Sequence, residues 1–80
     1  MKVAAIIPAY NEGMRIGNVL EVLERMTEID EIIVVSDGSE DDTVDVALKY
    51  NVTVIALPRN IGKGGAMKIG CDYSKGDIIL

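Results

Sequence analysis

The sequence has 80 residues, of which 49% are hydrophobic and 26% are charged, and its net charge is −5. This length allows one small domain and excludes a second. The high content of Ile, Val, Leu and Ala argues against a disordered chain. The net negative charge excludes a protein that binds the nucleic-acid backbone through its overall charge, so we expect no nucleic-acid partner.

The charge is unevenly distributed along the chain. Residues 1–45 contain eleven acidic and three basic side chains, whereas residues 46–80 contain two acidic and five basic ones. Because an anion is attracted to local positive potential, we expect any anionic ligand to bind toward the second half of the chain.

The cysteine content and the hydropathy of the chain indicate the cellular compartment in which we expect the protein. Cys71 is the only cysteine, so no internal disulfide and no cysteine-rich metal site can form, which is typical of a reducing compartment. We expect Cys71 to be a buried small hydrophobic residue. The apolar run before Pro8 is too short for a signal peptide or a membrane span, so the sequence predicts a cytoplasmic location.

Four short apolar runs rich in β-branched residues predict strands, at residues 3–7, 32–35, 52–57 and 78–80. Their apolar residues are continuous and do not alternate with polar ones. This pattern is typical of strands that are covered on both faces.

Helical patterns separate the first three predicted strands. After the first strand, five apolar residues share one stripe of an amphipathic helix, which we expect to be buried: Ile16, Val19, Leu20, Leu23 and Met26. After the second strand, residues 39–42 resemble a capping box. Val44, Ala47 and Leu48 then give a short buried stripe, and Asn51 is a candidate left-handed stop.

A third helix is predicted between the third and fourth strands. Residues 62–65 open it, residues 74–76 close it, and we expect four residues to form its apolar face: Ala66, Ile69, Gly70 and Tyr73. The order is therefore β-α-β-α-β-α-β, which predicts an α/β fold with three layers and a mainly parallel sheet. Such sheets bind ligands outside the carboxyl ends of their strands, so the loops at 8–13, 36–42 and 58–65 are the candidate site.

The first loop lacks the glycine pattern of dinucleotide-binding proteins and the phosphate-binding loop of nucleoside triphosphatases. It offers a strand exit fixed by Pro8, the ring of Tyr10 and the carboxylate of Glu12, which suit a base and a ribose. The alternative is a simple turn in which Asn11 caps the first helix and Tyr10 packs on the sheet edge.

In the second loop, Asp37 directly follows a buried strand. A carboxylate only accepts hydrogen bonds, and the ring N–H groups of uracil and guanine are matching donors. Gly38 would let the backbone approach a flat ring closely. The alternative is turn chemistry, in which Asp37 bonds its own backbone.

The third loop has three glycines among residues 62–65, with Lys63 between them and Arg59 upstream. Uncovered backbone N–H groups at a helix start, together with positive charge, form an anion site. The alternative is a flexible glycine-rich helix start.

These segments resemble a known family in their order and spacing. Four motifs carry the resemblance: residues 6–12 (IIPAYNE), residues 32–39 (IIVVSDGS) with Asp42 and Thr43, residues 60–66 (NIGKGGA) and residues 76–79 (GDII). Together they look like the N-terminal half of a family 2 glycosyltransferase of the GT-A fold, similar to the dolichyl-phosphate mannose synthases and their glucosyl relatives. One departure is visible, because many members have two acidic residues where this chain has Ser36 and Asp37.

The resemblance implies that residues 1–80 form a single partial nucleotide-sugar-binding domain. It implies eight binding residues, all in the three loops: Pro8, Ala9, Tyr10, Glu12, Asp37, Gly62, Lys63 and Gly64. The first-loop residues would border the base and ribose, Asp37 would accept from the base edge, and Lys63 with its flanking glycines would lie near the nucleoside or its phosphates.

The resemblance also implies an enzyme that transfers a sugar, with inversion, from a UDP- or GDP-linked donor to an acceptor hydroxyl or phosphate. The acceptor is open and could be lipid-linked, which would place a longer form at the membrane surface. Family members hold a divalent metal, Mg or Mn, on an Asp-x-Asp motif after the fourth strand. We expect these ligands and the catalytic base beyond Leu80, so the 80-residue chain alone should transfer no sugar.

Three other functions fit parts of the sequence. A truncated module could bind nucleotide weakly, or associate into homo-oligomers through an open strand edge. A phosphoacceptor domain fits the size and Lys63, but it expects paired acids at the end of the first strand, where this chain has Pro8 and Ala9. A sugar nucleotidyltransferase expects a glycine-rich first loop, which is missing.

Overall fold

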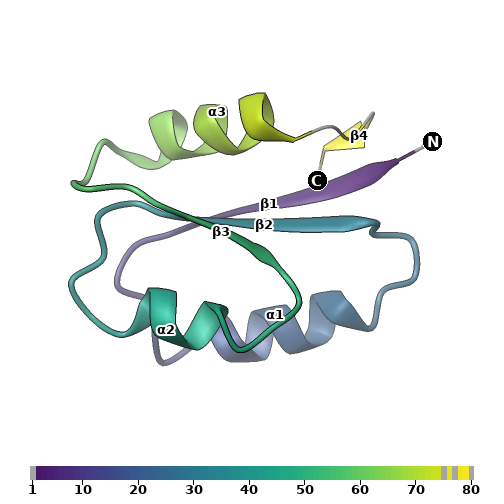
Figure 1. Ribbon diagram of the computed structural model, residues 1–80, viewed down its shortest axis with the longest axis horizontal. Coiled ribbons are helices and arrows are strands. Elements are labelled where there is room, and N and C mark those ends of the chain that lie inside the picture. The colour runs from purple at the N-terminus through teal and green to yellow at the C-terminus, as the bar shows by residue number, and fades with distance from the viewer. Residues whose placement is uncertain (1, 75, 77, 80) are drawn as a thin grey trace.

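The computed structural model describes residues 2–74, 76 and 78–79. Its elements alternate between strand and helix along the chain (Figure 1), in the order β1 (Val3–Ala9), α1 (Ile16–Glu24), β2 (Glu31–Ser36), α2 (Thr43–Ala47), β3 (Thr53–Ala56), α3 (Lys63–Tyr73) and β4 (Ile78–Ile79). The predicted β-α-β-α-β-α-β order is confirmed. Leu80, the last residue of the predicted fourth strand, lies outside the described residues.

The strands form one sheet in the order β3-β2-β1-β4, and every pairing is parallel. In the register, Ala9 lies opposite Ser36, and Ser36 lies opposite Ala56. The carboxyl ends of β1, β2 and β3 therefore meet at one edge of the sheet, which brings the three following loops together (Figure 1).

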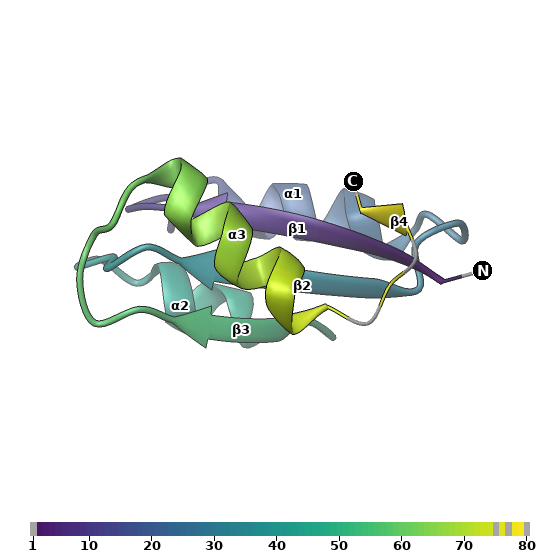
Figure 2. The same cartoon turned by 90° about the horizontal axis from the view of Figure 1, so that it is seen from above.

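The sheet is the middle layer of three. In Figure 1, α1 and α2 lie on one face and α3 lies on the other, and Figure 2 shows α3 crossing over β1 and β2. Alternate residues of β2 point to opposite faces, so Ile32 and Val34 pack under α1 and α2, while Ile33 and Val35 pack under α3. This explains why β2 is apolar without alternation.

The third helix lies very close to the sheet because of Gly70. A Cβ atom at this position would lie 2.4 Å from Cγ2 of Ile6 and 3.1 Å from Cγ2 of Val35. Both are core side chains with at most 3% exposure, so neither has room to move. The position of α3, and of the loop that precedes it, is therefore fixed by a glycine.

Several local expectations are wrong. Residues Val19, Met26, Leu48 and Tyr73 are exposed by 39% or more, although the apolar stripes predicted them to be buried. Met26 and Leu48 lie beyond the ends of their helices, since α1 ends at Glu24 and α2 at Ala47, whereas Val19 and Tyr73 lie within α1 and α3. Cys71 is half-buried beside the α3 core, close to its expected role.

The predicted strand exit at Pro8 is also wrong, because β1 continues to Ala9. Proline lacks an N–H and is tolerated where a strand has a free edge. Among the described residues, β4 pairs only with Val3 and Ala4, so one edge of β1 is open at Pro8. None of the helices in the described part of the chain is long and apolar enough to cross a membrane.

Candidate nucleotide-sugar site

A cavity of about 540 Å³ lies at the carboxyl ends of β1 and β2 and at the start of α3. All three loops contribute to it, and its lining residues are Ile7, Pro8, Ala9, Tyr10, Glu12, Arg15, Ile16, Val19, Asp37, Asn60, Gly62 and Lys63. The ring of Tyr10 is 46% exposed, so it offers an aromatic surface to the cavity.

The third loop is held by the carboxylate of Asp37, which is only 3% exposed. One carboxylate oxygen accepts a hydrogen bond from the N–H of Ile61 at 2.7 Å, and the other accepts one from the N–H of Gly62 at 2.9 Å. The side-chain amide of Asn60 donates to the backbone carbonyl of Asp37 at 3.3 Å. Backbone donors thus stabilise the buried charge, and the loop is fixed in return.

The second and third loops touch at Gly38, which has a φ of +70°. A Cβ atom here would lie 2.4 Å from the carbonyl carbon of Arg59 and from the backbone nitrogen of Asn60. We expected Gly38 to allow a close approach to a flat ring. In the structure it allows the close approach of two protein backbones.

The first loop is held by side chains of the segment that leads into α2. Backbone N–H groups of Asn11, Glu12 and Gly13 donate to the side chains of Ser39, Thr43 and Asp41, at 3.1, 2.9 and 3.0 Å respectively. The predicted capping box does not form, because Asp42 is the N-cap of α2 and makes no side-chain cap bond.

Asn11 occupies the left-handed region with a φ of 51°. Its side-chain oxygen accepts from the N–H of Glu40 at 2.8 Å, so the alternative in which Asn11 caps the first helix is wrong. Asn51, the candidate left-handed stop, has no positive φ. The left-handed conformation that was predicted for Asn51 is found instead at Asn11.

The charges at the cavity come from Glu12, Arg15, Asp37 and Lys63. Arg15 is paired with Glu12, with 3.6 Å between Nη1 and Oε2. Lys63 is exposed and is the first residue of α3, an eleven-residue helix. The N–H groups of a first helical turn have no partner within the helix, so Lys63 adds charge where an anion is already favoured.

Seven of the eight binding residues predicted from the sequence line this cavity, and Gly64 does not. Arg59, the other expected cation, does not line it either. Five lining residues were not predicted: Ile7, Ile16, Val19, Asn60 and Arg15. Asn60 stood inside a recognised motif and could have been found, whereas Arg15 and Val19 reach the cavity only because α1 begins beside it.

Ser36, where the chain departs from the family pattern of two acids, is 1% exposed and does not line the cavity. A carboxylate at this position would be buried. The departure therefore leaves the lining of the cavity unchanged.

A divalent metal needs a cluster of oxygen ligands. Within residues 2–74, 76 and 78–79, no group of three or more acidic, histidine or cysteine side chains is placed to hold a metal ion. The described residues therefore do not fit a metal centre.

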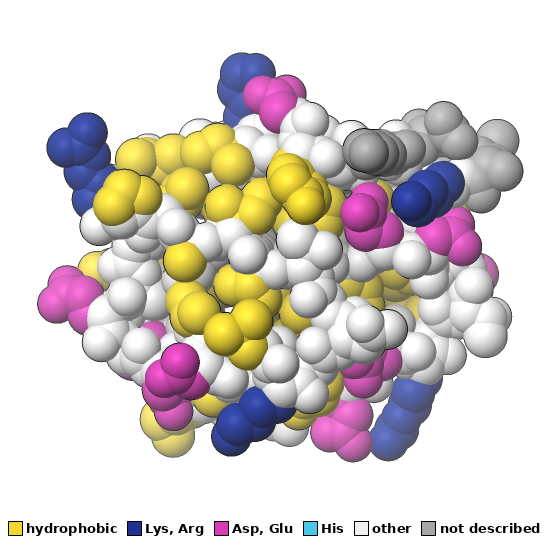
Figure 3. Space-filling view, viewed as in Figure 1, with side chains coloured by type: hydrophobic (Ala, Val, Ile, Leu, Met, Phe, Trp, Pro, Cys, Tyr) yellow, Lys and Arg dark blue, Asp and Glu magenta, His cyan; other side chains and the backbone are white. Residues whose placement is uncertain are grey.

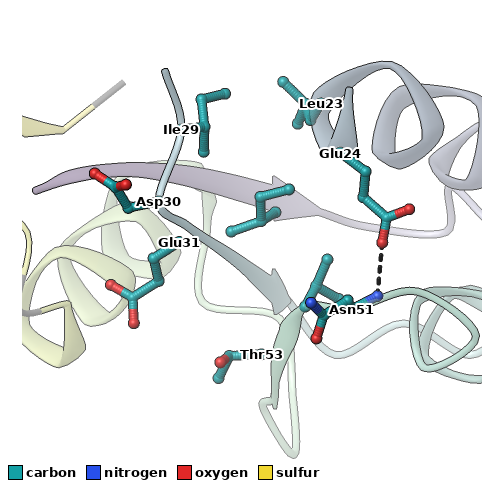
Figure 4. Close-up of a pocket in the computed structure, with 9 residues that line it drawn as sticks. Leu23, Glu24, Ile29, Asp30, Glu31, Asn51 and Thr53 are labelled. Atoms are coloured by element: carbon teal, nitrogen blue, oxygen red, sulfur yellow. Dashed lines mark hydrogen bonds between the residues drawn. The ribbon is translucent and has the colours of Figure 1, made fainter. Parts of the chain in front are cut away.

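A second cavity, of about 550 Å³, lies at the opposite end of the sheet between the start of β2 and the end of α1 (Figure 4). Its carboxylates hold the fold together. Glu24 accepts from the N–H of Asn51 at 2.7 Å, Asp30 from the N–H of Val3 at 2.8 Å, and Glu31 from the hydroxyl of Ser74 at 3.2 Å. Their roles are structural, so the cavity at the carboxyl ends is the better candidate site.

A parallel sheet with helices on both faces and a cavity at the carboxyl ends of its strands defines the class of α/β domains that bind ligands at that edge. The family model of glycosyl transferase family 2 matches residues 4–80. The chain belongs to this family of glycosyltransferases.

Relatives of known name agree with this assignment. The dolichyl-phosphate beta-glucosyltransferase of Mus musculus is 42% identical over 95 residues, and that of Homo sapiens is 39% identical over 95 residues. Each match covers 99% of this chain and 29% of the relative. The chain thus spans less than a third of the length of these relatives.

Solved structures give the same fold. Mannosyl-3-phosphoglycerate synthase from Rubrobacter xylanophilus matches with a TM-score of 0.86 and 30% identity, over 100% of this chain and 29% of that one. Glucosyl-3-phosphoglycerate synthase from Mycobacterium tuberculosis, solved with Mn2+, uridine diphosphate and glucosyl-3-phosphoglycerate, matches with a TM-score of 0.85 and 29% identity, over 98% and 31%. The fold is that of the GT-A glycosyltransferases.

Proposed function

We propose that residues 1–80 form one domain that binds a nucleoside-diphospho-sugar in the cavity at the carboxyl ends of β1 and β2. We further propose that the protein transfers the sugar to an acceptor oxygen. The single observation that carries the proposal is the convergence of the three loops on one cavity that has an aromatic side chain, two carboxylates and two cations.

The nucleoside would bind along the first loop. Pro8 and the exposed ring of Tyr10 give an apolar wall for the base, and Glu12 gives an acceptor for a ribose hydroxyl. Asp37 already accepts two backbone hydrogen bonds. Each carboxylate oxygen has a second lone pair, so Asp37 can also accept from an N–H of the base.

The diphosphate would bind at the start of α3. Gly62 and Lys63 line the cavity there, and the uncapped backbone N–H groups of the first helical turn favour a negative charge. This agrees with the excess of basic side chains in the second half of the sequence. Arg15 is a second cation, although Glu12 partly compensates its charge.

The proposed reaction is one in-line displacement. The acceptor oxygen attacks the anomeric carbon, the bond to the diphosphate oxygen breaks, and the configuration at that carbon inverts. A divalent metal would stabilise the departing diphosphate. The complex of the mycobacterial synthase with Mn2+ and uridine diphosphate supports a metal, and we place its ligands and the catalytic base after Leu80.

We propose uridine diphosphate as the carrier, with guanosine diphosphate as the competing choice. Two observations support uridine: the mycobacterial synthase has been solved with uridine diphosphate and with uridine-diphosphate-glucose. The names of the dolichyl-phosphate relatives support a lipid-linked phosphate as the acceptor. Such an acceptor would place the reaction at a membrane surface.

The test is an amide chemical-shift titration of the 80-residue chain with uridine diphosphate, guanosine diphosphate and NAD. We expect shifts localised at Tyr10, Glu12, Asp37 and Lys63 with a nucleoside diphosphate, larger for uridine than for guanosine, and none with NAD. A folded chain that responds to none of the three compounds would overturn the proposed site. A stronger response to guanosine diphosphate would overturn only the choice of base.

A further inference from the structure

Three consecutive backbone N–H groups of the first loop each donate to a different side chain at the start of α2 or just before it. Asn11 donates to Ser39, Glu12 donates to Thr43, and Gly13 donates to Asp41. Because the backbone of a strand or helix does not accept from these N–H groups, the shape of the first loop depends on three side chains about 30 residues away in the sequence.

Two of the three acceptors, Thr43 and Asp41, are bonded to each other. The hydroxyl of Thr43 accepts from Glu12 and donates to a carboxylate oxygen of Asp41, whose other oxygen accepts from Gly13. The same carboxylate also accepts from the N–H of Thr43 at 2.9 Å. Thr43 has 0% exposure, so without its hydroxyl the N–H of Glu12 would face a buried apolar side chain and lose its acceptor.

These side chains do not line the cavity, but the loop that they hold carries two residues that do, Tyr10 and Glu12. We infer that Thr43 and Asp41 are positioning residues, which fix the first loop in the shape that binds the nucleoside. The inference rests on the proposed function, because it assumes that the cavity takes a nucleoside diphosphate. It assigns these two residues no contact with the ligand.

The hydroxyl of Thr43 can be tested without a change in side-chain volume. Thr43→Val removes the hydroxyl and keeps the shape, whereas Thr43→Ser keeps the hydroxyl. Thr53→Val is the matched control, because Thr53 is a half-buried threonine of β3 at the far end of the sheet. Binding of uridine diphosphate and of uridine is measured by calorimetry, at a temperature where every variant is fully folded.

We expect Thr43→Val to weaken both ligands by about tenfold, the effect of one lost buried hydrogen bond on the loop that meets the nucleoside. The amide signals of Glu12 and Gly13 should shift in the free chain, Thr43→Ser should restore the affinity, and Thr53→Val should bind like the wild type. We expect the same fold-loss of affinity for uridine diphosphate and for uridine, because the first loop lies away from the diphosphate end of the cavity.

Other outcomes would overturn the inference in different ways. If Thr43→Val lowers the melting temperature but binds with wild-type affinity, Thr43 stabilises the fold and does not position the site. If Thr43→Ser fails to restore binding, the hydroxyl is not the cause. If the wild-type chain binds neither ligand, the proposed function fails and the inference fails with it. If the wild type binds and Thr43→Val binds with the same affinity, only the inference is overturned.

Discussion

Asp37 and Ile61 are joined by a 2.7 Å hydrogen bond from the backbone N–H of Ile61 to the buried carboxylate of Asp37. This bond links the loop after β2 to the loop after β3. The first loop is held by Asp41 of the loop after β2 and by Thr43, the first residue of α2. The loop after β2 is therefore the centre of the site, because the loops after β1 and β3 are both hydrogen-bonded to it.

Replacing Asp37 by Asn should destabilise the chain by about 1–3 kcal/mol, because one of the two backbone donors would then face an amide NH2 group and stay unsatisfied. The measurement is urea unfolding at neutral pH. Asp45→Asn is the control, since it neutralises an exposed carboxylate in the first turn of α2 and should cost under about 1 kcal/mol. Equal losses in the two variants would show that the bonds of Asp37 contribute little.

Gly62 and Gly64 give a matched pair, because a Cβ atom would meet nothing within 4 Å at either position. Gly62 has φ 97° and ψ 155°, a region open almost only to glycine, so Gly62→Ala should cost about 1–3 kcal/mol. Gly64 lies inside α3, so Gly64→Ala should stabilise the helix by up to about 1 kcal/mol. The measurement is the thermal unfolding midpoint of both variants. Similar midpoints would show that an alanine at position 62 is not strained.

The architecture could be predicted from the sequence because the same pattern, a short apolar run for each strand, is repeated along the chain. The strands are continuous apolar runs, and burial on both faces requires that pattern in the central strands β1 and β2, whereas β3 at the edge has no buried residue. The edge that carries the site then follows from the parallel order alone. Seven of the predicted binding residues lie at the cavity for this reason, since they end a strand, follow one closely or open α3.

The network between the loops could not be predicted from local patterns. Asn11, Asp41 and Thr43 each suit a local turn or cap, and Asp41 and Thr43 do bond each other, but each of the three also has a partner 28 to 31 residues away. Asp37 looked like a free acceptor because the sequence does not show which backbone N–H groups approach it. The exposed positions of Val19 and Leu48 were missed because the stripe of a short helix is wider than the sheet area that it covers.

The acid stability of the chain should depend on Asp41. Hydrogen bonds, first of all from the hydroxyl of Thr43, hold the pKa of Asp41 below its ordinary value of 3.8. A carboxyl whose pKa is depressed by folding stabilises the protein above the pKa of the unfolded chain, and this contribution is lost as the pH falls through the folded-state value.

We therefore expect Asp41→Asn to lower the free energy of unfolding at neutral pH and to make its fall in acid shallower. The difference between wild type and variant should shrink as the pH drops below about 4, the ordinary range of an Asp carboxyl. Urea unfolding at a series of pH values measures this. Curves that stay parallel from pH 7 to the acid limit would contradict a role for the Asp41 charge.

Lys63 should act on the diphosphate and not on the nucleoside, because it stands at the start of α3, where the helix N–H groups favour an anion. Lys63→Gln should weaken uridine diphosphate by about fivefold, which corresponds to about 1 kcal/mol for an exposed charge pair, and leave uridine binding unchanged. The loss should shrink as salt is added, because salt screens an exposed charge.

Lys68→Gln is the control for Lys63, since Lys68 lies further along α3 and is paired with Asp72 at 3.0 Å. It should bind both ligands as the wild type does. Calorimetry at low and high salt compares the three proteins. If Lys63→Gln weakened uridine and uridine diphosphate equally, the diphosphate would not lie at the start of α3, and the orientation proposed for the nucleotide in the cavity would have to be reversed.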